Sequence, residues 1–287
     1  MLRGREPMPY DVLSLDVGIT PALDAIAGAA EHAIAVKPIG RFLTKFAELK
    51  AACARPGGPR RIAIVGGGAG GVELALALRH GLHAALNAGH ADALRFTLVT
   101  EGEILASHNA RVRRAFRRIL GERNVMLREG ATVARISADA LHLESREAVA
   151  ADAVLVTTQA AAPRWFAGTG LAHDTGGFIA VGPTLQSLND PDIFAAGDCA
   201  GLVGAPRPKA GVFAVRAGPP LAANILRHTR GETLRAWRPQ AHHLALISTG
   251  EPYAVASWGP LKAEGRWLWT LKSFIDRRWI GRYRPAV

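Results

Sequence analysis

One glycine-rich segment of the sequence has the spacing required to bind a phosphate group. The segment 66–71 reads Gly-Gly-Gly-Ala-Gly-Gly and directly follows the apolar run 61–65. In a GxGxxG loop, Gly66 permits a sharp turn, Gly68 lets backbone amides approach a pyrophosphate, and Gly71 allows a helix to pack closely on a strand. A purely structural glycine turn is the alternative, but a strand before the loop and a helix after it favour dinucleotide binding. The predicted contacts are Gly66, Gly67, Gly68 and Gly71.

The elements around this loop must hold it at the edge of a sheet. An alanine- and leucine-rich helix is expected from about Val72 to Ala88, and its positive end would face the diphosphate. Apolar runs predict further strands at 94–99, 125–127, 132–136, 140–144 and 153–157. Alternation of strands with helices predicts an α/β fold with a doubly wound parallel sheet.

A carboxylate near the end of the second strand is the expected ligand of the adenosine ribose. Glu101 follows the strand 94–99 and would accept hydrogen bonds from the ribose hydroxyls while repelling a 2′-phosphate. This favours NADH over NADPH. The alternative is a solvated loop glutamate beside Glu103.

Composition excludes several other classes of protein. The 287 residues carry a net charge of +11 and only two cysteines, without a CxxC motif. No disulfide scaffold or metal site is predicted, and the cysteine content favours a cytosolic compartment. The basic run 108–120 has apolar residues at helical spacing, so a solvated helix face is favoured over a phosphate-binding surface. A nucleic-acid partner is not expected, because the arginines of that run fit the solvated face of a helix.

The C-terminal segment has a separate signal. Residues 266–280 place Leu268, Leu271, Ile275 and Trp279 on one helix face and basic residues on another. This pattern is typical of a helix that lies in a membrane interface, which would give peripheral contact with the cytoplasmic membrane face through 266–283. The alternative is packing on its own domain or on a second copy in a homodimer. No apolar run is long enough to span a bilayer.

Several segments together resemble one known family. The segment 66–75 resembles the nicotinamide-binding loop of the pyridine nucleotide-disulfide oxidoreductase superfamily, in its type II NADH dehydrogenase-like branch. The segment 192–200 resembles the second flavin motif, and 209–218 resembles the helix that faces the flavin ring. The stretch 10–21 resembles the return of the first flavin-binding half to its sheet. The tail 243–259, together with Asp276–Trp279, resembles the subgroup associated with selenide, water dikinase.

The resemblance implies FAD and NAD(H) as cofactors and assigns residues to them. Asp198 would hold a ribityl hydroxyl, and Gly197 would leave room for the ribityl chain. Glu73 matches a family glutamate near the nicotinamide, so it is the candidate catalytic residue that orients the carboxamide. Cys199 is expected to be a small buried residue rather than a redox centre, and Cys53 is expected in a loop. The remaining predicted flavin contacts are Gly18, Lys209 and Ala210.

The same resemblance predicts the domain organisation, an NAD domain inserted in an FAD-type domain. Residues 1–55 would be a remnant of the FAD-binding domain, and 58–165 an NAD(P)-binding Rossmann domain. Residues 166–235 would return to the FAD domain, and 236–287 would form a C-terminal α+β extension. Two departures from the family pattern stand out: no GxGxxG precedes Tyr10, so the chain is expected to be N-terminally incomplete, and residues 157–159 read Thr-Thr-Gln in place of Ala-Thr-Gly.

Two functions follow from these observations. The first is an FAD-dependent NAD(P)H oxidoreductase that passes hydride from nicotinamide to flavin and then to a small-molecule acceptor such as a quinone. The second is a flavin-poor nicotinamide-nucleotide-binding module, or a redox partner linked to selenophosphate metabolism. The sequence does not identify the electron acceptor.

Overall fold

The computed structural model describes residues 6, 8–21, 23–157 and 160–283, and it divides the chain into two compact units. Unit 1 comprises residues 1–20 and 160–241, and unit 2 comprises residues 21–159 and 242–287. The chain therefore leaves unit 1, builds most of unit 2, returns to unit 1 and ends in unit 2. Near the first two crossings, β2 (Thr20–Pro21) and β11 (Ala160–Ala161) form a two-stranded sheet.

Unit 2 is built on a five-stranded sheet in the order β3-β10-β4-β5-β6, with every determined pairing parallel. The strands are β3 (Ala33–Ala35), β4 (Arg61–Val65), β5 (Arg95–Val99), β6 (Val125–Arg128) and β10 (Ala153–Val156). This confirms the predicted α/β fold with a parallel sheet, and it confirms the strands expected at 94–99, 125–127 and 153–157.

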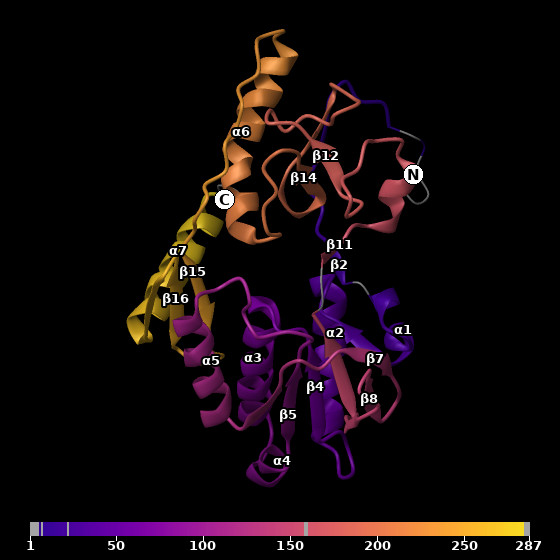
Figure 1. Ribbon diagram of the computed structural model, residues 1–287, viewed down its shortest axis with the longest axis vertical. Helices are drawn as coiled ribbons and strands as arrows, with labels where there is room; N and C mark the ends of the chain where they lie inside the picture. The colour runs from indigo at the N-terminus through magenta and orange to yellow at the C-terminus, as the bar shows by residue number, and fades with distance from the viewer. Residues whose placement is uncertain (1–5, 7, 22, 158–159, 284–287) are drawn as a thin grey trace. The chain divides into compact units, whose positions relative to one another are not determined.

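The alternation of side chains along β4 explains how this sheet is buried on both faces. Ile62 and Ile64 point into one core, which is shared with residues of α2, α3 and α5. Ala63 and Val65 point into a second core, which is shared with α1 and the strands β7–β9. The helices are α1 (Ala29–His32), α2 (Ile39–Cys53), α3 (Ala69–Ala85), α4 (Ala88–Asp92) and α5 (Ala110–Glu122), as Figure 1 shows.

The strands expected at 132–136 and 140–144 form a separate antiparallel sheet. It contains β7 (Val133–Ile136), β8 (Ala140–Leu143) and β9 (Ala148–Ala150) in sequence order. The basic helix α5 has its apolar side chains buried, as its spacing predicts, and Asn109 caps it by accepting hydrogen bonds from the backbone N–H groups of Arg111 and Val112.

The C-terminal segment packs on unit 2. Three antiparallel strands, β15 (Ala245–Ser248), β16 (Ala254–Trp258) and β17 (Leu261–Gly265), are followed by α7 (Arg266–Gly281), drawn in yellow in Figure 1. Ile247 and Val255 belong to the same core as α3 and α5. The structure groups residues 21–55 and 242–287 with unit 2, and some of their apolar side chains, among them Leu49 and Ile247, are buried in its core.

Unit 1 contains shorter strands that are paired two by two. β1 (Leu13–Leu15) pairs in parallel with β13 (Ile193–Ala195), and β12 (Ile179–Val181) pairs in parallel with β14 (Ala200–Leu202). The long helix α6 (Gly211–Thr229) and the short 3-10 helices Arg164–Gly168 and Gly197–Cys199 complete the unit. Its core includes Phe166 from the first of these 3-10 helices, Phe194 from β13 and Leu221 from α6. A short 3-10 helix, Leu23–Ala25, lies in unit 2.

Among the described residues, no helix combines the length and apolar character needed to cross a membrane. Thr158 and Gln159, two of the three residues that stand where the family has Ala-Thr-Gly, lie outside the described residues.

Candidate functional site

The glycine loop of unit 2 connects β4 to α3, as predicted, and the helix begins at Ala69, inside the motif. Gly66 has a φ of 122°, which favours glycine, and its N–H donates to the Val99 carbonyl at 2.9 Å. An ideal Cβ at Gly66 would lie 2.6 Å from Oγ1 of Thr157. At Gly71 it would collide with the carbonyl oxygen of Gly66. Both glycines are therefore required by the packing of the protein itself.

Gly68 differs from its neighbours. Its φ is −69°, which any residue can adopt, and an ideal Cβ there would meet no atom within 4 Å. Gly67, by contrast, is pressed against the side chain of the buried Thr100. Neither backbone conformation nor protein packing explains the glycine at position 68. The open space in front of it lies at the N-terminus of α3, where free N–H groups attract an anion.

The segment after β5 is held in place beside this loop. The Leu105 N–H donates to the Gly67 carbonyl at 2.7 Å, and the Ile104 N–H donates to Oε1 of Glu129, also at 2.7 Å. Arg117 pairs with Glu129 at 2.8 Å and with Glu103 at 2.7 Å. The hydrogen bond from Arg117 holds the pKa of Glu129 below its usual range.

The predicted ribose ligand Glu101 lies in this segment and is exposed. Its neighbour Glu103 is committed to ion pairs with Arg113 and Arg117, whereas no ion pair of Glu101 occurs among the described residues. The Glu103–Arg117–Glu129 network was not predicted, because its members come from three separate segments of the chain.

Glu73, the candidate catalytic residue, projects from α3 toward the C-terminal sheet. Its Oε1 accepts hydrogen bonds from the backbone N–H of Ser248 at 2.7 Å and from the Ser248 Oγ at 2.9 Å. Gly250, with a φ of 80°, lies so close to α3 that a Cβ there would collide with the Leu76 carbonyl oxygen. Sequence reasoning did not find Ser248, because a lone serine in an extended segment carries no signal.

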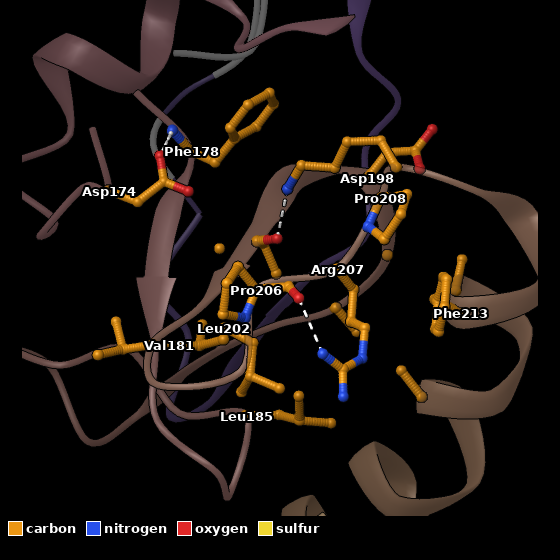
Figure 2. A pocket seen from close by; sticks show the side chains of 18 of the residues that line it. Asp174, Phe178, Val181, Leu185, Asp198, Leu202, Pro206, Arg207, Pro208 and Phe213 are labelled. Atoms are coloured by element: carbon orange, nitrogen blue, oxygen red, sulfur yellow. Dashed lines mark hydrogen bonds between the residues drawn. The ribbon is translucent and has the colours of Figure 1, made fainter. Parts of the chain in front are cut away.

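Unit 1 contains a cavity of about 430 Å³, and Figure 2 shows the side chains that line it. Four of the residues predicted to contact flavin lie along its wall: Gly197, Asp198, Lys209 and Ala210. Apolar side chains contribute much of the remaining wall, among them Phe178, Leu202 and Phe213. Gly18 is exposed and is not among the lining residues.

Lys209 is one of the residues that line the cavity. Its Nζ donates to the Ala200 carbonyl at 2.6 Å and lies 3.8 Å from the centroid of the Phe178 ring. Burial lowers the pKa of Lys209, and the negative charges of Asp174 and Asp198 oppose that effect. The cavity therefore has a cation, a carboxylate and an aromatic ring on a largely apolar wall.

Asp16, just after β1, is a residue that sequence reasoning missed. Gly197 has a φ of 71°, and a Cβ on it would collide with Oδ1 of Asp16. Burial, followed by the charge of Asp198, raises the pKa of Asp16. The two acids meet because β1 and β13 run in parallel and end at the same edge. An acid that closes an apolar strand could have signalled this position.

The two cysteines are both buried and neither forms a disulfide. Cys199 is fully buried and its Sγ donates to the carbonyls of Ala196 and Leu15, while burial raises the pKa of the thiol. This confirms that Cys199 is a small buried residue. Cys53 was expected in a loop, and that expectation is wrong: it is the last residue of α2 and is fully buried, because the helix turns it into the core of unit 2. Among the described residues, no cluster of His, Cys, Asp or Glu could hold a metal ion.

Comparison with known proteins adds to this geometry. The chain is 25% identical over 207 residues to the NADH dehydrogenase-like protein YutJ of Bacillus subtilis strain 168, a match that covers 72% of this chain and 54% of that protein. The chain thus spans about half the length of this relative. The sequence model of the pyridine nucleotide-disulphide oxidoreductases matches residues 4–223.

Two solved structures share the fold. The sulfide:quinone oxidoreductase of Aquifex aeolicus aligns with a TM-score of 0.73 and 17% identity, over 94% of this chain and 68% of its own. NDH2 of Plasmodium falciparum, solved in complex with NADH, aligns with a TM-score of 0.74 and 14% identity, over 94% and 74% respectively. At these identities the structures establish the fold alone, whereas the sequence model covers most of the chain. The chain belongs to the pyridine nucleotide-disulphide oxidoreductase family.

Proposed function

We propose that this protein is an NADH-dependent flavin oxidoreductase that passes reducing equivalents through FAD to a small-molecule acceptor, for which a quinone is the leading candidate. The observation that carries the proposal is Gly68, a glycine before the start of α3 that neither backbone conformation nor protein packing requires. A close approach of a ligand's pyrophosphate explains it, because any side chain at position 68 would project into the space that the phosphates need. The family uses FAD and NAD(P)H as its cofactors.

Glu101 sets the preference for NADH in this proposal. It is exposed beside the glycine loop and has no ion pair among the described residues, so its carboxylate can accept hydrogen bonds from the ribose. A 2′-phosphate would meet the same negative charge. Titration calorimetry with both nucleotides tests this assignment, and we expect NADH to bind at least tenfold more tightly than NADPH. Equal binding of NADPH would remove the role of Glu101, and no binding of either would refute the nucleotide site.

Glu73 contributes to orientation of the nicotinamide in this proposal. Ser248 holds one of its carboxylate oxygens, which restricts the side chain to few rotamers before any ligand arrives. A restrained acceptor loses less entropy on binding than a free one. The carboxylate then accepts from the carboxamide N–H₂ of the nicotinamide and orients the ring.

The cavity of unit 1 supplies the flavin contacts. Asp198 can accept a hydrogen bond from a ribityl hydroxyl, and Lys209 places a positive charge on the same wall. When bound, FAD supplies the hydride acceptor and the electron donor of the reaction. Gly197 lines the cavity beside Asp198, and its lack of a side chain lets the Asp16 carboxylate lie close to it.

A second candidate function rests on a different observation. GxGxxG occurs once in these 287 residues, in unit 2, and that loop serves the nicotinamide nucleotide. The diphosphate of FAD would need a second site of comparable strength. A flavin-poor nucleotide-binding module, or a redox partner in selenophosphate metabolism, would need only unit 2. Oxidation of NADH by the protein with added FAD and a quinone separates the two, because the oxidoreductase would catalyse it and the module would not.

A further inference from the structure

The segment between β5 and α5 contacts two glutamates that have different tasks, and the first of them is Glu129. Its Oε1 accepts the Ile104 N–H at 2.7 Å, and its two oxygens bind Arg117 at 2.8 and 2.9 Å. A bidentate pair of this kind fixes the orientation of the guanidinium group. Glu129 therefore holds both the backbone of the segment and the arginine beside it.

Glu103, by contrast, contacts only arginine side chains. Its carboxylate lies 2.7 Å from Arg117 and 3.2 Å from Arg113, and no backbone N–H in the part of the chain that the structure describes donates to it. The Glu103 side chain is 55% exposed, whereas those of Arg113 and Arg117 are 21% and 33% exposed. The carboxylate is thus the outermost group of the network, with two less exposed cations next to it.

The location of Glu103 relates this network to the nucleotide. Leu105, two residues farther along, donates its N–H to the Gly67 carbonyl at 2.7 Å, so the segment lies against the glycine loop. In a Rossmann unit the adenosine ribose lies between that loop and the end of the second strand, and a 2′-phosphate is bound by an arginine nearby. Guanidinium groups are the preferred partners of phosphate. The two arginines that could take this part are already paired with glutamate.

We propose that Glu103 is a second specificity-determining residue, which disfavours NADPH by occupying Arg113 and Arg117. The inference rests on the nucleotide site proposed above and adds to the role of Glu101: Glu101 repels a 2′-phosphate directly, whereas Glu103 withholds the cations that would bind it. A phosphate group carries a charge of about −1.5 to −2 at neutral pH. The ion-pair network and Glu101 together hold more carboxylates than guanidinium groups, so the phosphate would meet an excess of negative charge.

Titration calorimetry of the full chain with NADH and NADPH tests this role. In Glu103→Gln the preference for NADH, expressed as the ratio of the two dissociation constants, should fall about tenfold, because NADPH binds more tightly once the arginines are released. Glu122→Gln is the matched control. Glu122 is 53% exposed and pairs with Arg118 on the same helix at 2.8 Å, so its replacement removes an equivalent charge and should leave the ratio unchanged. An equal fall in both variants would overturn the assignment to Glu103.

Glu129→Gln separates specificity from positioning. Because Glu129 holds the segment itself, this change should weaken both nucleotides to a similar extent and lower the melting temperature. If Glu103→Gln behaves in the same way, Glu103 has a positioning role and the proposal is wrong. The proposal also fails if Glu103→Gln keeps the NADH preference of a wild-type chain that binds NADH, and the nucleotide site then stands. A wild-type chain that binds neither nucleotide refutes the nucleotide site, and this inference with it.

Discussion

The glycine loop of unit 2 and the Gly-Asp loop of unit 1 are both strand-to-helix connections, yet they are built differently. The first stands on a continuous five-stranded sheet with a core on each face. The second stands on three-residue strands paired two by two. The proposed nucleotide site in the first loop depends on the absence of a side chain at Gly68, whereas the proposed flavin site in the second depends on the side chains of Asp198 and Lys209. A site formed by the backbone requires a rigid sheet to hold the backbone in place. A site formed by charged side chains can be supported by a smaller sheet.

The largest expected effect comes from filling the space at Gly68. Gly68→Val should weaken NADH binding by at least about a hundredfold, because the branched side chain would occupy the place of the pyrophosphate. The melting temperature should change little, since a Cβ at this position meets no protein atom. Titration calorimetry and thermal unfolding measure the two quantities.

Gly71→Ala provides the contrast within the same loop. Its Cβ would collide with the Gly66 carbonyl oxygen, so it should lower the melting temperature of unit 2. If Gly68→Val binds NADH normally, the loop does not hold a dinucleotide.

The second effect concerns the loop built from charged groups. Asp198→Ala should weaken FAD binding by at least about tenfold, since a hydrogen bond to a carboxylate contributes roughly 1.5–3 kcal/mol. Flavin fluorescence titration measures the affinity. Asp192→Asn, at an exposed position outside the cavity, is the matched control for Asp198→Ala.

The unmodified 287-residue chain should retain less than one FAD per protein through gel filtration, because its one GxGxxG loop is assigned to the nicotinamide nucleotide.

The difference between the two loops also explains what the sequence could predict. The glycine loop, β4 and α3 are contiguous, so local pattern was enough to find them. Asp198 and Lys209 were found through motifs that surround each of them. Ser248 could not be found in this way, because its importance comes from Glu73, a partner brought near by folding. Asp16 follows an apolar strand, so its position had a local signal, but its contact with Gly197 depends on folding. The grouping of residues 21–55 and 242–287 with unit 2 was missed for the same reason, because it depends on contacts between segments that are far apart in the sequence.

A smaller effect is expected from Ser248, which fixes Glu73. Ser248→Ala removes the hydroxyl hydrogen bond but keeps the one from the backbone N–H, so the dissociation constant of NADH should rise about threefold. Ser248→Thr retains the hydroxyl and should restore affinity. A purely structural role would lower the melting temperature of Ser248→Ala while leaving NADH affinity unchanged.

The smallest expected effect is on the free energy of unfolding, and it concerns the carboxylates of Asp152 and Asp192, which directly precede β10 and β13. Asp152 is bound by the backbone N–H groups of Arg60 and Arg61 and by the Arg61 side chain, and these bonds lower its pKa to about 2. A depressed carboxyl pKa stabilises the fold above the unfolded value, near 3.9, and this stabilisation is lost as pH falls toward 2. Asp152→Asn should therefore lower the free energy of unfolding by about 1 kcal/mol at neutral pH, and by progressively less below pH ~4. In unit 1, Oδ1 of Asp192 lies 2.6 Å from Nε2 of His228, but the Asp192 side chain is 54% exposed. Asp192→Asn should therefore lower the free energy of unfolding by less than Asp152→Asn does. Urea unfolding across pH measures both variants. An equal loss from the two would mean that the sheet of unit 2 is no more firmly anchored than the strand pairs of unit 1.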